Sequence, residues 1–268
     1  MIKRVGLIAG RGRFPFLFCE EARKAGVEEI HVVAFHEDTD PELEKIVDRM
    51  DWVYVGQLRK TINYFRKNNI TQIALCGQVK PGRLFQGMRP DLKAMWILAS
   101  LKERNAESIF GAICDSFNKS GIEVISSVSF LDQHLATEGV MGKVKLNRSR
   151  KKDWEFGKKI AKESSRLDIG QSVVVKRGTV LAVEGFEGTD KCIKRGGLLG
   201  HGGVTAVKVA KPNQDMRIDV PCIGLRTVES LKEAGAITLA VEAQKTLFID
   251  KDKVLDECDK AGICVVGI

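Results

Sequence analysis

The sequence predicts an α/β protein built from two domains, and three observations support this prediction. Short apolar segments of strand length alternate with longer amphipathic segments through most of the chain. The strands expected in the first half are apolar on both faces, which is typical of a parallel sheet covered by helices on both sides. The chain has 268 residues, near the length at which a single core stops growing and a second domain forms.

In the first half, the strand-length segments alternate with segments whose apolar residues recur at helical spacing, as in LRKTINYFRKNN at 58–69. Each strand–helix–strand unit favours parallel pairing. This half is therefore predicted to be one parallel sheet with helices on both faces. The expected strands are 5–10, 30–35, 52–56, 72–77 and 122–126, and the expected helices are 14–26, 58–69, 91–103 and 106–119.

The second half is predicted to be a separate, mixed α/β domain. Segment 138–152 loses hydrophobic periodicity and collects basic residues, which is typical of a linker. The predicted domains are therefore 1–137 and 153–268. Segment 171–185 is expected to be a β-hairpin with its turn at 177–178. The other expected strands are 204–210, 237–241, 246–249 and the final ICVVGI, and the expected helices are 153–166, 227–235 and 251–261.

The balance of charge favours an anionic partner. The chain has 43 Lys and Arg residues against 35 Asp and Glu residues, a formal net charge of +8 and a pI of about 9.1. Such a charge suits a phosphorylated ligand, a nucleic acid or an anionic membrane surface. Aromatic residues make up 6% of the chain and no segment interleaves them with basic residues, so no nucleic acid is expected as a partner.

The cysteines and the apolar segments predict the compartment. The seven cysteines are odd in number and include no C-x-x-C pair, which favours a reducing environment over a disulfide scaffold or a zinc ribbon. The first apolar run is too broken for a signal peptide, and no run approaches the roughly 20 residues of a membrane-spanning helix. We therefore expect a cytoplasmic protein, at most peripheral on the inner face of the cytoplasmic membrane.

A glycine pattern follows the first expected strand, and two interpretations explain it. GRGRFP, residues 10–15, lies where a Rossmann-like domain holds phosphate on backbone N–H groups at a helix N-terminus. Gly10 and Gly12 are therefore candidate phosphate-binding residues. Pro15 stands where the third glycine of a dinucleotide fingerprint is expected, so NAD binding is not expected and a plain tight turn is the alternative.

Acidic and basic side chains meet at the end of the predicted hairpin, in EGFEGTDKCIKR at 184–195. Carboxylates suit a hard cation, and Lys or Arg suits phosphate oxygens. This mixture indicates a metal–phosphate site, and a solvated loop with internal ion pairs is the alternative. The side chains concerned are Glu184, Glu187, Thr189, Asp190, Lys191, Lys194 and Arg195.

A second charged segment is bounded by prolines. In KPNQDMRIDVP, residues 211–221, Asp215, Arg217 and Asp219 alternate with apolar residues. In an extended strand the three charged side chains share one face. Arg217 between two carboxylates would keep both ionised and could also turn to a phosphate. The closing proline restricts the residue before it to extended geometry, so the segment is predicted to aim charged side chains at a ligand.

These motifs recur, in order and in spacing, in one family of enzymes. They are GLIAGRGRFP (6–15), DIGQSVVV (168–175), VLAVEGFEGTD (180–190), KPNQDMRIDVPCIGLRTVE (211–229) and the closing GICVVG. Together they resemble the UDP-2,3-diacylglucosamine pyrophosphatase family of the LpxI type, nearly from end to end of the chain. This resemblance implies an N-terminal Rossmann-like domain and a C-terminal α/β domain.

The resemblance also implies an activity in lipid A biosynthesis. Such an enzyme is a magnesium-dependent UDP-2,3-diacylglucosamine diphosphatase, which cleaves the pyrophosphate to give UMP and 2,3-diacylglucosamine 1-phosphate (lipid X). Water is taken to attack the α-phosphorus. The aspartate of the R-x-D-x-P motif corresponds to Asp219 in this sequence. A non-catalytic nucleotide or nucleotide-sugar binding protein that uses GRGRFP is the alternative.

With pyrophosphate as the target, the charged residues receive expected roles. Asp219 is the expected catalytic base or metal ligand. Glu187, Asp190 and Asp215 are the expected ligands of Mg²⁺, which would neutralise phosphate oxygens and activate water. The expected phosphate- and substrate-binding residues are Gly10, Gly12, Thr189, Lys191, Arg195, Lys211, Gln214 and Arg217.

Two further expectations concern the lipid part of the substrate. An apolar cleft is needed so that the acyl chains stay out of water when the lipid leaves the bilayer. Phe14, Phe16, Phe18, Phe85 and Trp96 are candidates for its lining, with ordinary core packing as the alternative.

A membrane surface is an expected partner, because a basic run would attach the protein to anionic lipid. A solvated linker is the alternative for this run, and a homodimer is left open as a further partner. The run is Lys143, Lys145, Arg148, Arg150, Lys151 and Lys152.

Overall fold

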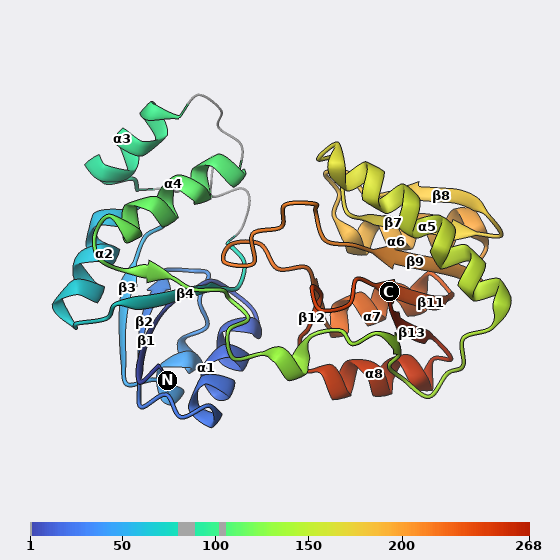
Figure 1. The fold of residues 1–268 in the computed structure, drawn as a ribbon, viewed down its shortest axis with the longest axis horizontal. Coiled ribbons are helices and arrows are strands. Elements are labelled where there is room, and N and C mark those ends of the chain that lie inside the picture. The colour runs from blue at the N-terminus through green and yellow to red at the C-terminus, as the bar shows by residue number, and fades with distance from the viewer. Residues whose placement is uncertain (1, 80–88, 102–105) are drawn as a thin grey trace. The chain divides into compact units, whose positions relative to one another are not determined.

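The chain folds into two units, each with a sheet and a core of its own (Figure 1). The computed structural model describes residues 2–79, 89–101 and 106–268. Unit 1 comprises Met1–Phe130 and the short segment Met216–Ile218, and unit 2 comprises Leu131–Asp215 and Asp219–Ile268. The α/β class predicted from the sequence is confirmed.

Unit 1 is built on a five-stranded parallel sheet in the order β3-β2-β1-β4-β5. The strands are apolar on both faces because helices cover both faces, as the sequence predicts. The strands are β1 Arg4–Ala9, β2 Glu29–Phe35, β3 Arg49–Val53, β4 Gln72–Cys76 and β5 Glu123–Val124. The helices are α1 Phe14–Lys24, η1 Pro41–Ile46, α2 Leu58–Lys67, α3 Leu92–Ser100 and α4 Ala106–Asn118.

The two faces of this sheet carry separate cores. Helices α1 and η1 pack on one face, where Phe18 and Leu43 are fully buried. Helices α2, α3 and α4 pack on the other face, where Phe65 and Phe117 are fully buried. Residues 102 and 103, the end of the helix expected at 91–103, lie outside the described residues.

The strand order creates a topological switch point between β1 and β4. Strand β1 pairs with β2 on one side and with β4 on the other. In open α/β sheets, ligands bind in the crevice outside the carboxyl ends of the strands at such a point. Gly10 follows β1 and Gly77 follows β4. A Cβ atom on Gly77 would lie 2.8 Å from the carbonyl carbon of Gly10, so the two turns pack backbone against backbone at this crevice.

Unit 2 is built on a six-stranded mixed sheet in the order β6-β13-β11-β9-β7-β8. The hairpin predicted at 171–185 is confirmed, with positive φ at Arg177 and Gly178 in its turn. The sheet strands are β6 Gly139–Val140, β7 Ser172–Lys176, β8 Thr179–Val183, β9 Val204–Lys208, β11 Ala236–Val241 and β13 Cys264–Gly267. A separate pair consists of β10 Cys222–Ile223 and β12 Leu247–Phe248.

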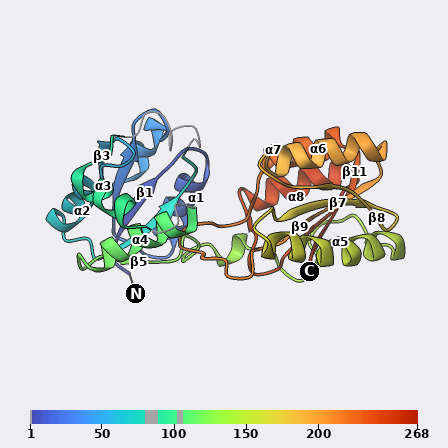
Figure 2. The same cartoon turned by 90° about the horizontal axis from the view of Figure 1, so that it is seen from above.

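Helices cover both faces of this sheet as well. Figure 2 shows α5 on one side and α6, α7 and α8 on the other. Ala161 of α5 is buried in one core, and Ile193, Leu231 and Val254 are buried in the other. The helices are α5 Arg148–Arg166, α6 Thr189–Gly200, α7 Leu225–Glu233 and α8 Lys251–Lys260, with a short 3-10 helix η3 at Asp132–His134.

The segment predicted to be a linker, 138–152, lies inside unit 2. The boundary between the units falls after Phe130, and strand β6 pairs with β13. The side chain of Asn147 accepts a hydrogen bond from the backbone N–H of Arg150 at 2.9 Å and caps α5. The basic residues from Arg148 onward are therefore helical. This first turn of α5 consists mostly of charged residues and lacks apolar periodicity, so in the sequence it resembles a loop.

Helix α6 is the main element that the sequence analysis does not predict. Its interior contains glycines, each of which disfavours a helix by about 1 kcal/mol relative to alanine. The structure explains them by close packing. A Cβ atom on Gly196 would lie 2.5 Å from Val174 of the sheet, and one on Gly197 would lie 2.4 Å from Ala234 beside α7. Close tertiary contacts thus require the glycines, and the same glycines lower the helix propensity by which the sequence would have predicted α6.

The structure bears on two features that the sequence analysis used to predict the compartment, the cysteines and the apolar segments. All seven cysteines have free thiols, and burial raises the pKa of Cys19 to about 12. Within the described ranges, no helix has both the length and the apolar character needed to span a membrane.

Candidate active site

An apolar pocket of about 280 Å³ lies at the switch point of unit 1. The ends of β1 and β4 form its base, and helices α2, α3 and α4 form its walls. The polar lining residues Gln57 and Thr61 bond to the backbone, since Thr61 Oγ1 donates to the carbonyl of Gln57 at 3.0 Å and Gln57 Oε1 accepts from Tyr54 N–H at 2.9 Å. The lining includes Ile8, Gly10, Phe35, Leu75, Gly77, Ala94, Ile97, Leu98, Ile113, Phe117 and Ile218.

Of the aromatic residues expected to line an apolar cleft, the four that the structure describes do not line this pocket. Phe18 is fully buried in the core on the α1 face, and Phe14 and Phe16 pack against that same core. Trp96 is 72% exposed on α3. Phe85 lies outside the described residues. Core packing, the alternative interpretation, accounts for the three phenylalanines of α1.

The glycines of GRGRFP form a tight turn beside the pocket. The N–H of Gly10 donates to the carbonyl of Cys76 at 2.8 Å, and a Cβ atom on Gly10 would lie 2.6 Å from the carbonyl oxygen of Gln78. Gly12 has φ of +97°, a conformation that favours glycine. Backbone packing and turn geometry thus account for both residues, and their contact with phosphate stays a prediction.

The proline-bounded segment forms a turn, so the expectation of an extended strand is wrong. The N–H of Asp219 donates to the carbonyl of Asp215 at 3.0 Å, which closes a turn of five residues. Asp215, Arg217 and Asp219 therefore do not share a strand face. The turn forms because Ser127 of unit 1 holds it: the N–H of Ser127 donates to the carbonyl of Met216 at 2.9 Å, and its buried hydroxyl lies 2.9 Å from the carbonyl of Arg217.

The division between the two units falls between Ile218 and Asp219. Ile218 belongs to unit 1, where it lines the pocket and packs against the core of α2 and α4. Asp219 is the next residue and is exposed. Gln214 also fixes the position of Asp219, because its Nε2 donates to the carbonyl of Asp219 at 2.6 Å and its Oε1 accepts from the N–H of Lys211 at 2.8 Å.

A buried polar cluster centres on Thr189, the first residue of α6. Thr189 Oγ1 donates to Glu184 Oε1 at 3.0 Å and lies 3.2 Å from the hydroxyl of Ser172. Lys208 Nζ donates to the same threonine oxygen at 3.3 Å and to the carbonyl of Cys222 at 3.1 Å. Glu184 and Lys208 are each 8% exposed. Glu184 Oε2 is buried and has no hydrogen-bond partner among the described residues.

This cluster is suited to an anion. The first N–H groups of a helix are unpaired within the helix, and the helix dipole makes its N-terminus positive. Lys208 adds a buried cation beside that N-terminus. A helix N-terminus together with a lysine is a common arrangement for binding phosphate.

The thiol of Cys222 lies near both Asp219 and Lys208, a member of the Thr189 cluster. Burial raises the pKa of the Cys222 thiol to about 12; the Lys208 cation acts to lower it and the Asp219 carboxylate to raise it. The thiol therefore lies within the fields of both groups. Asp219 and the Thr189 cluster belong to one region of unit 2.

Glu187 and Arg195 bind each other. Arg195 Nη2 donates to Glu187 Oε1 and also to the carbonyl of Val183 at 2.9 Å. Glu187 Oε2 accepts from the N–H of Gly185 at 2.9 Å. The hydrogen bond from Arg195 holds the pKa of Glu187 below its usual value. In this structure both side chains hold the loop that precedes α6.

The other predicted ligands also have protein partners. Asp190 accepts a hydrogen bond from Thr227 Oγ1 at 3.0 Å and lies 3.5 Å from Arg226. Lys211 pairs with Asp168, and Lys191 is exposed on α6. Across the part of the chain that the structure describes, no three Asp, Glu, His or Cys side chains form a group that could hold a metal ion. Glu187, Asp190 and Asp215 are thus not gathered into one donor set.

Ser172, Lys208 and the pocket are features that the sequence analysis did not single out. Lys208 ends an apolar strand and Ser172 begins one, and neither position differs from an ordinary strand boundary in the sequence. The signal that could have found Lys208 is a lysine in the otherwise apolar segment VTAVKVA, where a charge is buried only if it is paired or hydrogen-bonded. The pocket has no local signal because its lining comes from three strands, three helices and several loops.

Solved structures resemble this chain only weakly. The biotin carboxylase subunit of a pyruvate carboxylase matches with a TM-score of 0.28 and 14% identity, over 65% of this chain and 35% of that chain. The pyruvate carboxylase of Rhizobium etli matches with a TM-score of 0.30 and 12% identity, over 65% of this chain and 15% of that chain. Structural similarity this weak indicates neither the fold nor the function of this chain.

The comparison of sequences is decisive. The model of the LpxI N-terminal domain matches residues 4–134, and the model of the LpxI C-terminal domain matches residues 137–266. The UDP-2,3-diacylglucosamine pyrophosphatase LpxI of Caulobacter vibrioides is 29% identical over 280 residues, which cover 100% of this chain and 98% of that protein. Because the two domain models follow each other along almost the whole sequence, the chain belongs to the LpxI family.

Proposed function

We propose that this protein hydrolyses the pyrophosphate of UDP-2,3-diacylglucosamine to UMP and 2,3-diacylglucosamine 1-phosphate, a step in lipid A biosynthesis. The relative from Caulobacter vibrioides carries the name of this activity and aligns over the whole chain. Membership of the LpxI family supports the same class of reaction, hydrolysis of a phosphoric anhydride.

The apolar pocket of unit 1 is the observation that carries this function. It lies at the switch point, where α/β sheets usually bind the polar parts of nucleotides. Its lining is instead aliphatic and aromatic, and no charged residue belongs to it within the described part of the chain. Such a lining suits an alkyl chain. A phosphate or ribose bound there would lack hydrogen-bond partners, which disfavours the alternative of a nucleotide-binding protein that uses GRGRFP.

The Thr189 cluster of unit 2 provides polar groups suited to the pyrophosphate. Lys208 and the N-terminus of α6 attract the oxygens of the pyrophosphate. Thr189 holds Lys208 beside that N-terminus and is itself held by Glu184 and Ser172. These contacts orient the cation before substrate arrives, which favours binding of a developing negative charge.

Asp219 acts as the general base in the proposed reaction. It accepts a proton from a water molecule as the water oxygen bonds to the α-phosphorus. The bond from the α-phosphorus to the bridging oxygen breaks, and the lipid 1-phosphate leaves with that oxygen. Gln214 fixes the backbone of Asp219, and the turn anchored on Ser127 fixes the residues before it. Placement of this kind matters because proton transfer needs hydrogen-bond reach.

Magnesium is the proposed cofactor. The residues present fit a Mg²⁺ ion that is held mainly by phosphate oxygens and water. Mg²⁺ is usually held by one or two carboxylates together with phosphate oxygens and water, so it needs no group of three protein ligands. Glu184, with a buried oxygen that has no partner among the described residues, is the carboxylate that would hold it. When bound, it would neutralise phosphate oxygens and favour ionisation of water.

The direct test is release of UMP from UDP-2,3-diacylglucosamine by the purified protein. We expect UMP to appear with Mg²⁺, to fall to background with EDTA, and to return when Mg²⁺ is added in excess. UMP release that is unaffected by EDTA would contradict the role of the metal but leave the proposed hydrolysis in place. Binding of the substrate with no release under any metal condition would favour a non-catalytic binding protein.

The position of attack gives a second measurement. The products are the same whichever phosphorus is attacked, so an isotope must decide. The acyl chains are fixed in an apolar pocket, and the phosphate joined to the diacylated sugar is held near them. The α-phosphate is farther from the lipid along the substrate, and its uridine side carries no apolar chain that would exclude water. We therefore expect ¹⁸O from labelled water to appear in UMP. Label in the lipid 1-phosphate would overturn the α-phosphorus assignment.

A further inference from the structure

Helix α3 has two apolar faces, and only one of them is covered. Successive residues of an α-helix are rotated by about 100°. Ala94, Ile97 and Leu98 therefore point to one side, and the structure places them in the lining of the apolar pocket. On the other side, Leu92 is 78%, Met95 53% and Trp96 72% exposed. We define Leu92, Met95 and Trp96 as the outer face of α3.

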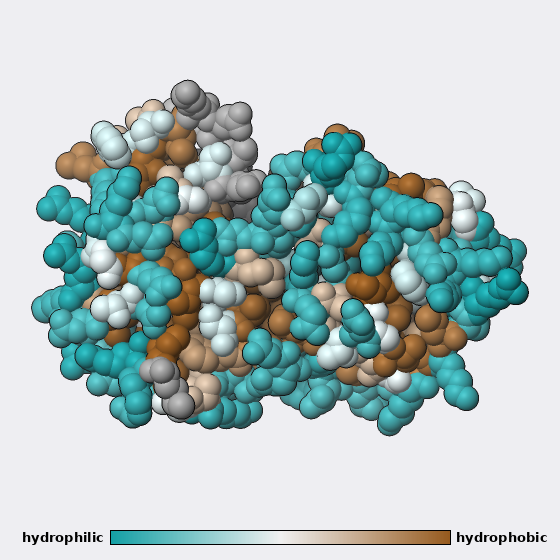
Figure 3. All heavy atoms as spheres, in the orientation of Figure 1, coloured by the Kyte–Doolittle hydropathy of each residue, from teal (hydrophilic) through white to brown (hydrophobic). Residues whose placement is uncertain are grey.

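The outer face of α3 is unusual for a surface in contact with water. A surface helix normally carries polar residues on the side opposite its buried stripe. Here three large apolar side chains occupy that side within a helix of nine residues. Figure 3 shows hydrophobic side chains gathered over α3. Contiguous exposed apolar groups of this kind mark a binding surface more often than single exposed residues do.

Basic side chains adjoin the outer face. Arg59, Arg66 and Lys93 line a surface hollow that Leu92 also lines. Helices α2 and α3 lie side by side, which brings the two arginines of α2 next to α3 (Figure 1). Among the residues that the structure describes, none of the three cations forms an ion pair with a carboxylate. Asp91, the acidic residue at the start of α3, uses its carboxylate to accept hydrogen bonds from the N–H groups of Arg59 and Ala94.

We propose that the outer face of α3, together with Arg59, Arg66 and Lys93, docks on the surface of an anionic lipid bilayer. Apolar side chains enter the boundary between headgroups and acyl chains, and Trp is favoured at that depth. The cations reach lipid phosphates and are attracted by the negative surface potential of the bilayer. A lipid surface fits better than a protein partner because the other face of the same helix lines a pocket suited to an alkyl chain, a point that rests on the proposed function.

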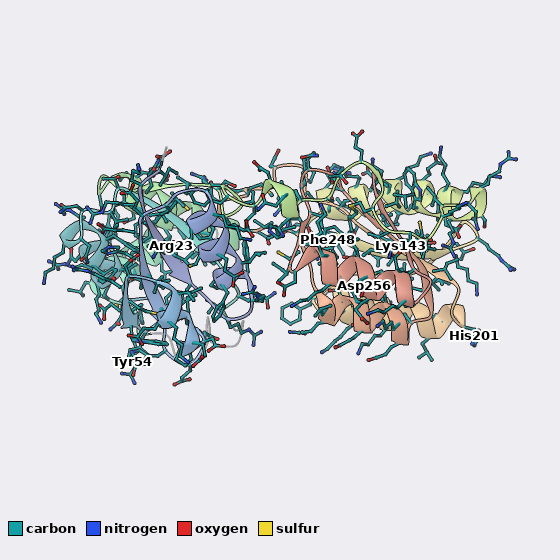
Figure 4. The ribbon with its side chains drawn as sticks, turned by 90° about the horizontal axis from the view of Figure 1, so that it is seen from below. Arg23, Tyr54, Lys143, His201, Phe248 and Asp256 are labelled. Carbon is teal, nitrogen blue, oxygen red and sulfur yellow. The ribbon has the colours of Figure 1, made fainter. Side chains whose placement is uncertain are left out.

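This surface differs from the basic run that the sequence suggests. That run lies in unit 2, where Lys143 is beside α8 and its N–H donates to Asp259 at 2.7 Å (Figure 4). Lys151 lies 3.9 Å from Glu155 on the exposed side of α5. No exposed large apolar side chain occurs between 141 and 166, within the described part of unit 2. The run offers charge alone, whereas the outer face of α3 offers charge and apolar area.

Vesicle binding without substrate tests the surface independently of hydrolysis. The vesicles are phosphatidylcholine with phosphatidylglycerol, and phosphatidylcholine alone is the control. We expect Trp96→Glu and Met95→Glu each to weaken partitioning by at least about tenfold, and neutralising Arg66 to weaken it about fivefold. The matched control is Leu198→Glu, an equally exposed apolar position on a helix of unit 2, which should bind as the wild type does. Thermal melting checks that every variant is folded.

A second measurement reports insertion directly. The chain has three tryptophans, so the Trp52→Phe, Trp154→Phe double variant leaves Trp96 as the reporter. Its emission should shift to the blue and be quenched by brominated lipid when anionic vesicles are added. Two outcomes would overturn the assignment: vesicle binding that depends on Lys143, Lys145, Lys151 and Lys152 but not on Trp96, or a wild-type dimer that Trp96→Glu converts to a monomer without any change in vesicle binding.

Discussion

Asp219→Asn is expected to lower kcat by about 10²–10⁴-fold while KM changes little. Asparagine keeps the size and the hydrogen-bonding geometry of the side chain but cannot accept the proton of the attacking water. A group that acts chiefly in the transition state affects turnover more than substrate binding. Steady-state release of UMP from UDP-2,3-diacylglucosamine measures both constants.

Two further variants separate the role of Asp219 from a general effect on folding. Gln214→Glu keeps the acceptor for Lys211 N–H but loses the donor to the carbonyl of Asp219. It should lower kcat by less than Asp219→Asn does, because only the position of the base changes. Glu163→Gln, at an exposed carboxylate of α5, is the control. Near-normal turnover in folded Asp219→Asn would remove this residue from the mechanism.

Ala94→Phe is expected to shorten the acyl chain that the enzyme uses best. Ala94 is 8% exposed and lines the pocket from α3, so a benzyl group there occupies space that an alkyl chain would otherwise fill. Each methylene transferred from water to an apolar site is worth about 0.8 kcal/mol, which is about fourfold in kcat/KM. For substrates dispersed as monomers, kcat/KM of the wild type should rise by up to this factor per methylene until the pocket is full.

In Ala94→Phe the same series should level off at a shorter chain, and the loss should reach about 60-fold where three methylenes are displaced. Monomeric dispersion is essential, since a chain that leaves a bilayer is already out of water and gains little from the pocket. Ala25→Phe, at the exposed end of α1, introduces the same side chain away from the pocket and should follow the wild-type series. Identical chain-length profiles for Ala94→Phe and wild type would show that the acyl chains bind elsewhere.

The sequence by itself determined most of the elements and their class. Segments such as VGLIAG and IHVVAF are apolar on both faces, and hydrophobic burial then requires a parallel sheet with helices on both sides. The hairpin at 171–185 follows from local turn chemistry at Arg177 and Gly178. The family follows from the motifs, because their order and spacing extend over the whole chain. These properties depend on residues that are close together in the sequence.

Only the tertiary structure decided how the candidate site is assembled. Helix α6 exists because Gly196 and Gly197 permit close contact with Val174 and Ala234, so tertiary packing offsets the poor helix propensity of glycine. The segment 215–219 becomes a turn because Ser127, some 90 residues earlier, binds the carbonyls of Met216 and Arg217. Loop-closure entropy opposes contacts of such separation until many of them form together, so no local pattern reveals them.

The same distinction applies to the functional residues. Asp219 could be found from its motif. Glu184, Thr189 and Lys208 form a cluster only in the folded chain, because they come from a loop, a helix and a strand of unit 2. Glu187 and Arg195 carry the right charges for metal and phosphate, but in the structure each binds the other. A sequence specifies which charges are available. Folding decides which of them neutralise one another and which face a ligand, because electrostatic energy depends on distance and burial in space rather than on position along the chain.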